Sequence, residues 1–348
     1  MPRLAELGLA LRAGLLTLLA LALMLPAWGD PYVVKLATRI LVFALAAAAL
    51  DLALGVGGMV SFGHAAFLGL GAYVVGINFL HGFEGSLLLG FAPTQSLVLQ
   101  LVLAALLAGG FALLTGAISL RTRGVAFIMI TLAFAQMLYY LFVSLRRYNG
   151  ADGIALWNRS DGGLLDLEDP VAFYFLCLAA LLLFLFVGGR LYHSRFGRAL
   201  RAARDNERRA QALGIDTYRV RLVAYGISGA VTGIAGVLLA NATYFVGPAY
   251  LSWPVSGQLL VMVVLGGMGT LVGPVFGALV LLLLEEFLPG LLDSVRPGLG
   301  ESWKIVLGPL LVAIALYARG GLWGVLARRR VARVRWTGPR AAKAPRHV

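Results

Sequence analysis

A dense cluster of charged residues lies at positions 194–221, and its residue types suit protein–protein contact rather than catalysis. The cluster is rich in arginine and lies between two apolar runs that are each long enough to span a membrane. A strongly basic loop of this kind is expected on the cytoplasmic side. Within residues 198–213 the apolar positions fall on one side of a helix, and Gly214 is placed to end that helix. This pattern predicts a short amphipathic helix that fits a groove on a partner protein, with a helix lying on the membrane surface as the alternative.

Few polar residues lie inside the apolar runs, and each has two readings. Asp51 lies where a charge costs about 2.5–3.5 kcal/mol on insertion scales, so it should face protein or water. We expect either a pathway residue or, preferably, a buried acid bonded to Ser61 or to broken backbone. His64 could relay protons, although a structural hydrogen bond is favoured. Glu285 and Glu286 are expected to close a span on its outer side, either solvated or in contact with a partner protein.

Two glycine-rich breaks interrupt the apolar runs, at residues 54–64 (LGVGGMVSFGH) and 265–274 (LGGMGTLVGP). Both contain Gly-Gly-Met, and both are expected on the cytoplasmic side. Paired broken segments in two halves of a transporter point to its substrate pathway, and their shared orientation predicts a parallel internal repeat. The pathway and hinge candidates are therefore Asp51, Gly57, Gly58, Ser61, His64, Gly266, Gly267 and Gly269.

Composition predicts an all-α, polytopic membrane protein. Of the 348 residues 60% are hydrophobic and 13% are charged, whereas soluble domains are about 45–50% apolar and about 25% charged. The apolar residues form runs near the length that a helix needs to cross a bilayer. The run at 257–266 is too short to cross alone and is expected to be a half-helix or a re-entrant segment. We place about ten spans at residues 8–28, 36–54, 62–80, 95–118, 125–143, 171–190, 221–243, 257–266, 271–288 and 303–318.

The basic residues orient these spans. The loop with Arg121 and Arg123, the cluster and a basic tail are expected inside, whereas the loops at 81–93, 144–170 and 245–254 are expected outside. Both termini are then cytoplasmic. The sequence divides into a transmembrane domain at 1–320, with its cytoplasmic loop at 194–220, and a basic cytoplasmic tail at 321–348. Because the basic residues behind the net charge of +13 lie in loops and in the tail, nucleic-acid binding is not expected. The single cysteine, Cys177, suggests neither a disulfide nor a metal site.

The segment SRFGRALRAARDNERRAQALGID, at 194–216, resembles the cytoplasmic loop of LivM-type permeases. These are membrane subunits of ATP-binding-cassette importers for branched-chain amino acids. Stretches at 55–72, 121–134 and 265–278 match the same family in order and spacing. Together the matches touch most of the chain between residues 40 and 290.

The resemblance implies a bacterial inner-membrane importer with several partners. These are a second, related permease that forms a heterodimer, two cytoplasmic ATPases and an extracytoplasmic binding protein. The sequence has no GxxxxGK[ST] motif, so ATP and magnesium would bind to the partners, and this chain is expected to hold no cofactor or metal and to be no enzyme. The resemblance implies that the loop docks in a cleft of the ATPase, where Ala210 and Leu213 fill the cleft. The implied docking residues are Arg204, Asp205, Asn206, Glu207, Ala210, Leu213 and Gly214.

Two departures leave the substrate open. Gln136 stands where the family often has Glu, and residues 149–154 replace a Thr-Gly-Gly-rich stretch. We expect branched-chain or other hydrophobic amino acids, with urea or short amides as the alternative. From other classes, an ion-coupled secondary transporter or a passive channel would need no docking helix. Replacing Ala210 with Trp is expected to separate these classes, because only the importer should lose coupling.

Overall fold

The computed structural model describes residues 30–87, 92–163, 166–295, 298, 300–317, 321 and 324. The predicted span at 8–28 and nearly all of the predicted tail lie outside these residues. The elements are α2 (Pro31–Asp51), the π-helix η1 (Leu52–Val56), α3 (His64–Glu84), α4 (Leu97–Ser119), α5 (Val125–Ser144), η2 (Arg146–Tyr148), β1 (Ile154–Ala155), α6 (Pro170–His193), α7 (Arg195–Asp205), α8 (Glu207–Ala212), α9 (Thr217–Thr243), β2 (Phe245–Val246), η3 (Pro248–Leu251), α10 (Trp253–Gly266), α11 (Gly273–Val295), η4 (Gly300–Ser302) and α12 (Trp303–Tyr317).

Within the described residues, 7 helices are long and apolar enough to cross a membrane. They are α2 together with η1, then α3, α4, α5, α6, α9 and α11. As the sequence predicted, α10 is shorter, at 14 residues. The protein is therefore a multi-pass helical membrane protein, while the count of ten spans, the side of the termini and the internal repeat stay predictions.

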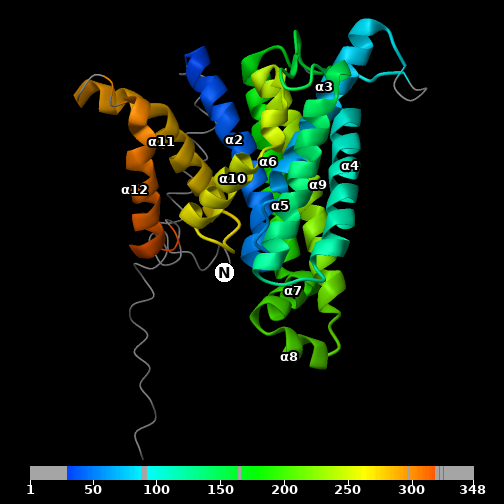
Figure 1. The fold of residues 1–348 in the computed structure, drawn as a ribbon, viewed down its shortest axis with the longest axis vertical. Coiled ribbons are helices and arrows are strands. Elements are labelled where there is room, and N and C mark those ends of the chain that lie inside the picture. The colour runs from blue at the N-terminus through cyan, green and yellow to red at the C-terminus, as the bar shows by residue number, and fades with distance from the viewer. Residues whose placement is uncertain are drawn as a thin grey trace, which may run out of the picture.

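The helix at the centre of the bundle is α2, which runs between α6, α9 and α11 (Figure 1). Its most apolar stretch is 89% buried within the chain. The four alanines at residues 46–49 expose no surface at all. A helix that is apolar on every side is typical of a buried position, and the alanines let neighbouring backbones come close.

Small residues also join α9 to α3 and α4. A side chain at Gly71 would clash with the carbonyl oxygen of Gly233, and one at Gly236 would clash with the carbonyl oxygen of Leu68. On the α4 side, Gly229 packs against Ala112. In a membrane, lipid tails are as apolar as the side chains, so burying apolar surface does little to drive helices together. Close packing through small residues stabilises their association instead.

The loops gather at two ends of the bundle. At one end, which we call the inner end, α7 and α8 project beyond the membrane helices (Figure 1). At the opposite, outer end β1 pairs with β2, with Ile154 opposite Val246. Among the described residues, the loops that the sequence assigns to the cytoplasmic side lie together at the inner end. Those that it assigns to the opposite side lie together at the outer end, as the positive-inside pattern predicts.

The segment at 245–254 differs from the expected outer loop. Val246 packs beside Gly76 and Leu251 packs on Gly69, and both apolar side chains are fully buried. Gly69 lies about 10 Å deeper along α3 than Gly76. The chain therefore re-enters the bundle beside α3, and α10 begins inside it as a half-helix. Residues 245–254 contain no charged residue, which is compatible with a segment that enters the bundle. We had taken the same lack of charge as the mark of an outer loop.

We predict that Gly71→Ala and Gly236→Ala each destabilise the protein by about 1–3 kcal/mol, because a Cβ would force α3 and α9 apart. Thermal unfolding in detergent measures the effect. The control is Gly110→Ala on α4, where a Cβ meets nothing within 4 Å. If Gly71→Ala unfolds at the same temperature as Gly110→Ala, the close packing of α3 on α9 is wrong.

Candidate functional site

The carboxylate of Asp51, the last residue of α2, holds the second glycine-rich break. Asp51 is fully buried, and its oxygens accept hydrogen bonds from the amide nitrogens of Gly269 at 2.6 Å and Leu271 at 3.2 Å. The expected backbone partner is thus present, but it belongs to the second break, 218 residues away, and Ser61 is not a partner. Hydrogen bonds to a charged group contribute about 1.5–3 kcal/mol each, so this carboxylate fixes the second break against the end of α2, just before the first break.

A third element, α7, meets the breaks at the same point. The guanidinium of Arg204 donates to the carbonyl oxygen of Gly55 in η1. A Cβ built on Gly269 would lie 3.1 Å from that same oxygen and 3.6 Å from a guanidinium nitrogen of Arg204. We call Asp51, Gly55, Arg204, Gly269 and Leu271 the junction. Arg204 is one of the implied docking residues, whereas here its guanidinium bonds within its own chain.

The junction requires glycine at its closest approaches. Gly58 has φ +71° and faces the Arg204 side chain, and Gly269 has φ +74°. L-residues with a side chain rarely adopt this left-handed conformation, so both positions need glycine. The other predicted hinge glycines, Gly57, Gly266 and Gly267, lie in the same two breaks beside the junction.

Ser61 and His64 do not join the junction. The Ser61 hydroxyl lies 2.9 Å from the Tyr225 hydroxyl. His64 Nε2 lies 2.8 Å from Ser228 Oγ, which donates its only proton to the carbonyl oxygen of Ala49 at 2.6 Å. His64 Nε2 must therefore be the donor, and its Nδ1 has no partner among the described residues. The His64–Ser228 hydrogen bond thus joins α3 to α9 and, through Ser228, to Ala49 of α2, which fits the favoured structural reading of His64.

The predicted single helix over 198–213 is wrong, because the chain breaks at Asn206. Asn206 is extended, with φ −156° and ψ 99°, and its side chain accepts the amide of Arg209 at 3.0 Å to cap α8. The helix ends as predicted: Gly214 has φ +80°, and the Ile215 amide returns to the carbonyl oxygen of Ala210. We call α7 and α8 together the inner platform.

The apolar side of the inner platform faces its own chain. Leu200, Ala203 and Ala210 are buried, and Leu200 shares a core cluster with Val56 and Met59 of the first break. Ala210 therefore cannot fill a cleft on a partner, and Ala210→Trp would disturb this chain instead. Leu213, by contrast, is 74% exposed.

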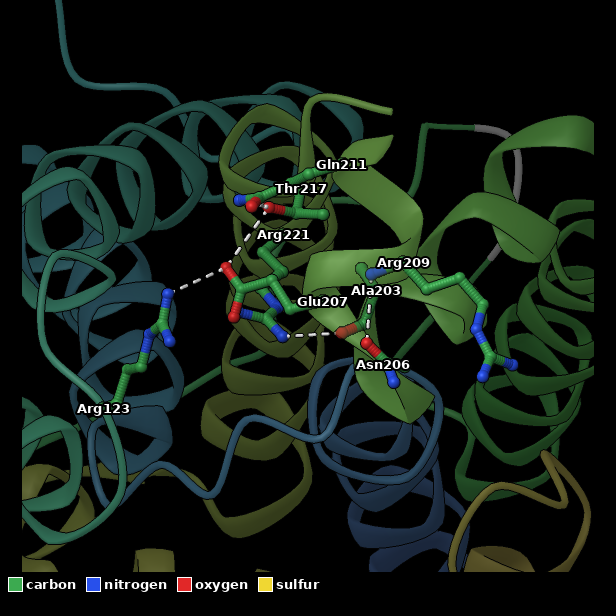
Figure 2. A network of polar contacts seen from close by, with 8 residues as sticks. All are labelled: Arg123, Ala203, Asn206, Glu207, Arg209, Gln211, Thr217 and Arg221. Atoms are coloured by element: carbon green, nitrogen blue, oxygen red, sulfur yellow. Dashed lines mark hydrogen bonds and ion pairs between the residues drawn. The ribbon is translucent and has the colours of Figure 1, made fainter. Parts of the chain in front are cut away.

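Glu207 also acts within the chain. Its carboxylate lies 3.3 Å from a nitrogen of Arg123 and 3.2 Å from one of Arg221, and it accepts a hydrogen bond from Thr217 (Figure 2). Arg221 donates as well to the carbonyl oxygen of Ala203 at 2.8 Å. Glu207 thus holds α8 against α9 and the loop between α4 and α5. No local pattern could identify Arg123 or Arg221 as partners, because each is distant from Glu207 in sequence.

Three charged residues within three positions of Asn206 form no ion pair. Among the described residues, Asp205, Arg208 and Arg209 form no ion pair, and all three are exposed. With Leu213 they make up an exposed face of mixed charge around one apolar side chain, which we call the docking face after the role that the resemblance implies for it. Unpaired charges at the rim of a contact confer specificity and speed of association.

We predict that Asp51→Leu lowers the free energy of unfolding by about 2 kcal/mol or more, because it leaves two buried amides without an acceptor. Asp51→Asn keeps one acceptor oxygen and should lose less. Thermal unfolding in detergent compares the two, with Thr38→Val as control, since the Thr38 hydroxyl bonds only within α2. An Asp51→Leu protein as stable as Thr38→Val would contradict the junction.

Comparison with known proteins places this architecture in a family. Residues 32–315 match the family described as branched-chain amino acid transport system / permease component. The permease protein LivM of the high-affinity branched-chain amino acid transport system of Escherichia coli K12 is 29% identical over 332 residues, 88% of this chain and 74% of the relative. LivM of Salmonella typhimurium LT2 is 29% identical over 336 residues, with the same coverage. The permease LivH of the E. coli K12 system is 31% identical over 150 residues, 43% of this chain and 44% of the relative. No solved structure matches the chain.

The matched region contains α2 to α11, both glycine-rich breaks, the junction and the inner platform. The match thus covers all the helices that contribute residues to the junction and to the inner platform. The chain belongs to the family of permease components of branched-chain amino acid transport systems and is a permease of the LivM type.

Proposed function

We propose that this chain is one permease subunit of an ATP-driven importer in a bacterial cytoplasmic membrane. A second, related permease completes the membrane unit, two cytoplasmic ATPases bind at the inner end, and an extracytoplasmic binding protein delivers substrate at the outer end. The observation that carries the proposal is the junction, in which Arg204 of the inner platform donates to Gly55 of the first glycine-rich break, and Asp51 beside that break accepts from Gly269 of the second.

The names of the relatives guide the choice of substrate and partner. LivM and LivH are each named as permeases of a high-affinity branched-chain amino acid system, and both occur in E. coli K12. Two related permeases in one organism's system support a heterodimer here. We therefore assign branched-chain or other hydrophobic amino acids as the substrate class.

The junction suggests how the ATPases would act on the pathway. When ATP closes the ATPase pair, the docking face of the inner platform moves with it. Arg204 transmits this motion to Gly55, and Asp51 transmits it to Gly269 and Leu271. The inner ends of α2, α10 and α11 then tilt together, and the glycines beside the junction absorb the backbone change. The pathway at the inner end closes while the outer end opens.

The proposal is tested by extracting the tagged chain gently from native membranes and identifying what accompanies it. We expect a second permease and two ATPases. In Arg208→Glu/Arg209→Glu we expect recovery of the ATPases to fall at least about tenfold, because both charges belong to the docking face. The control, Arg146→Glu/Arg147→Glu, reverses two exposed arginines in η2 at the outer end and should leave recovery unchanged.

Recovery of this chain alone, folded and able to move leucine without ATP, would contradict the proposal in favour of a self-sufficient carrier. Equal loss of the ATPases in both double variants would contradict the docking face, because it would show a general effect of charge reversal rather than a contact at the inner platform.

A further inference from the structure

The charged side chains of the membrane spans differ in whether the chain provides them with a partner. On α11, Glu285 and Glu286 each accept a hydrogen bond within the chain. The expectation that these two glutamates close a span is wrong, because α11 continues to Val295. Arg190, in the last turn of α6, has no hydrogen bond or ion pair among the described residues. The surroundings of Arg190 therefore bear on what it binds.

Arg190 lies at the inner end of an exposed apolar stripe on α6. Leu183, Phe186 and Val187 are 65%, 64% and 51% exposed. Their spacing of three and four residues places all three on the same side of the helix as Arg190, which is exposed as well. In a membrane, an exposed apolar stripe of a spanning helix is in contact with lipid tails. Arg190 thus lies where the lipid-facing side of α6 reaches the inner surface of the membrane.

The side chain of Arg190 turns back along this stripe. Its guanidinium carbon lies 5.9 Å from the centroid of the Phe186 ring. Phe186 is about 6 Å deeper along the helix axis than Arg190. A long basic side chain near the end of a span usually extends toward water, because a charge is costly nearer to the hydrocarbon. An anionic group at the level of the lipid headgroups would neutralise the guanidinium where it lies.

Two further arginines follow directly at the start of α7. Arg195 and Arg198 are exposed, and a spacing of three residues makes them neighbours on one side of the helix. Among the described residues, neither side chain forms a hydrogen bond or an ion pair. The sequence contains no acidic residue between Asp169 and Asp205. We call Arg190, Arg195 and Arg198 the basic corner, since they surround the turn from α6 into α7.

We propose that the basic corner binds the phosphate of an anionic phospholipid in the leaflet at the inner end, with the acyl chains along Leu183, Phe186 and Val187. Guanidinium groups present N–H donors in a fork that matches a phosphate. Clusters of arginine next to a membrane helix attract anionic lipid, whereas a zwitterionic headgroup brings its own cation. The bound lipid holds the start of the inner platform at the membrane surface. This inference goes beyond the proposed function, because it needs only this chain and its membrane.

An ATPase is the other candidate for the basic corner, and the structure favours lipid. The docking face begins at Asp205, about 15 Å along α7 from Arg195, so a protein bound there need not reach the corner. The docking face also has charges of both signs around Leu213, whereas the basic corner has one sign and continues into a lipid-facing stripe.

The test is a titration of the purified full-length chain in detergent with phosphatidylglycerol or with phosphatidylcholine of the same acyl chains, read by native mass spectrometry. We expect the wild type to bind phosphatidylglycerol at least about tenfold more tightly. Arg190→Gln/Arg198→Gln should lose this preference. Arg190→Lys/Arg198→Lys should keep most of it, because the positive charges remain. The matched control, Arg146→Gln/Arg147→Gln, removes two exposed arginines at the outer end and should behave like the wild type.

Two further measurements separate lipid binding from misfolding and from capture of a free anion. Without added lipid, Arg190→Gln/Arg198→Gln should unfold at the wild-type temperature, because these side chains form no hydrogen bond within the described chain. Inorganic phosphate should not compete with phosphatidylglycerol, since it has no acyl chains to lie along the stripe.

A preference for phosphatidylglycerol that survives in Arg190→Gln/Arg198→Gln would overturn the site. If that variant also lost the ATPases on extraction from native membranes, the basic corner would be a protein contact instead. An equal loss of preference in Arg146→Gln/Arg147→Gln would overturn the site too, because it would show a general effect of net charge. Competition by inorganic phosphate would contradict the lipid and leave a site for a free anion.

Discussion

The hydrogen bonds of the Asp51 carboxylate hold together segments that are distant in sequence. A carboxylate in an apolar interior is costly unless its oxygens find donors, and here the amides of Gly269 and Leu271 supply them. The same amides are free to donate only because the second break leaves the helical pattern. The carboxylate thus gains donors and the two amides gain an acceptor, so that neither buried group is left without a hydrogen bond. The result is a fixed contact between the centre of the bundle and the α10–α11 turn.

The two ends of the molecule are built differently around this contact. At the outer end Arg159 is buried, donates to the carbonyl oxygens of Asn241 and Leu167, and lies 4.4 Å over the ring of Phe173. The β1–β2 pair adds a further connection there. The inner end instead joins its breaks through hydrogen bonds to glycine-rich backbone, with the Glu207 ion pairs holding α8 beside them. A rigid outer end and a jointed inner end suit a protein that receives motion from partners at the inner end.

Sequence patterns predicted the helices well, because long apolar runs and basic loops are local signals. They also predicted the glycine breaks and the left-handed glycine after α8. They missed the break at Asn206, since an asparagine within a helical pattern becomes a cap only when its side chain turns back to the amide of Arg209. They misplaced Ala210 because an amphipathic pattern does not say whether its apolar side faces a partner or its own chain. The partners of Asp51 and Glu207 depend on tertiary contacts that no local pattern contains.

The central claim is that the inner platform and the second break move as one unit. Spin labels at Leu213→Cys and Met268→Cys, both exposed positions, measure the distance between them in a background where the buried Cys177 is replaced by alanine. A second pair, Met268→Cys with Trp157→Cys, reports on the outer end. In the full complex, we expect ATP under non-hydrolysing conditions to change the second distance and leave the first unchanged. A Leu213–Met268 distance that shifts with ATP while the Met268–Trp157 distance stays fixed would contradict the account.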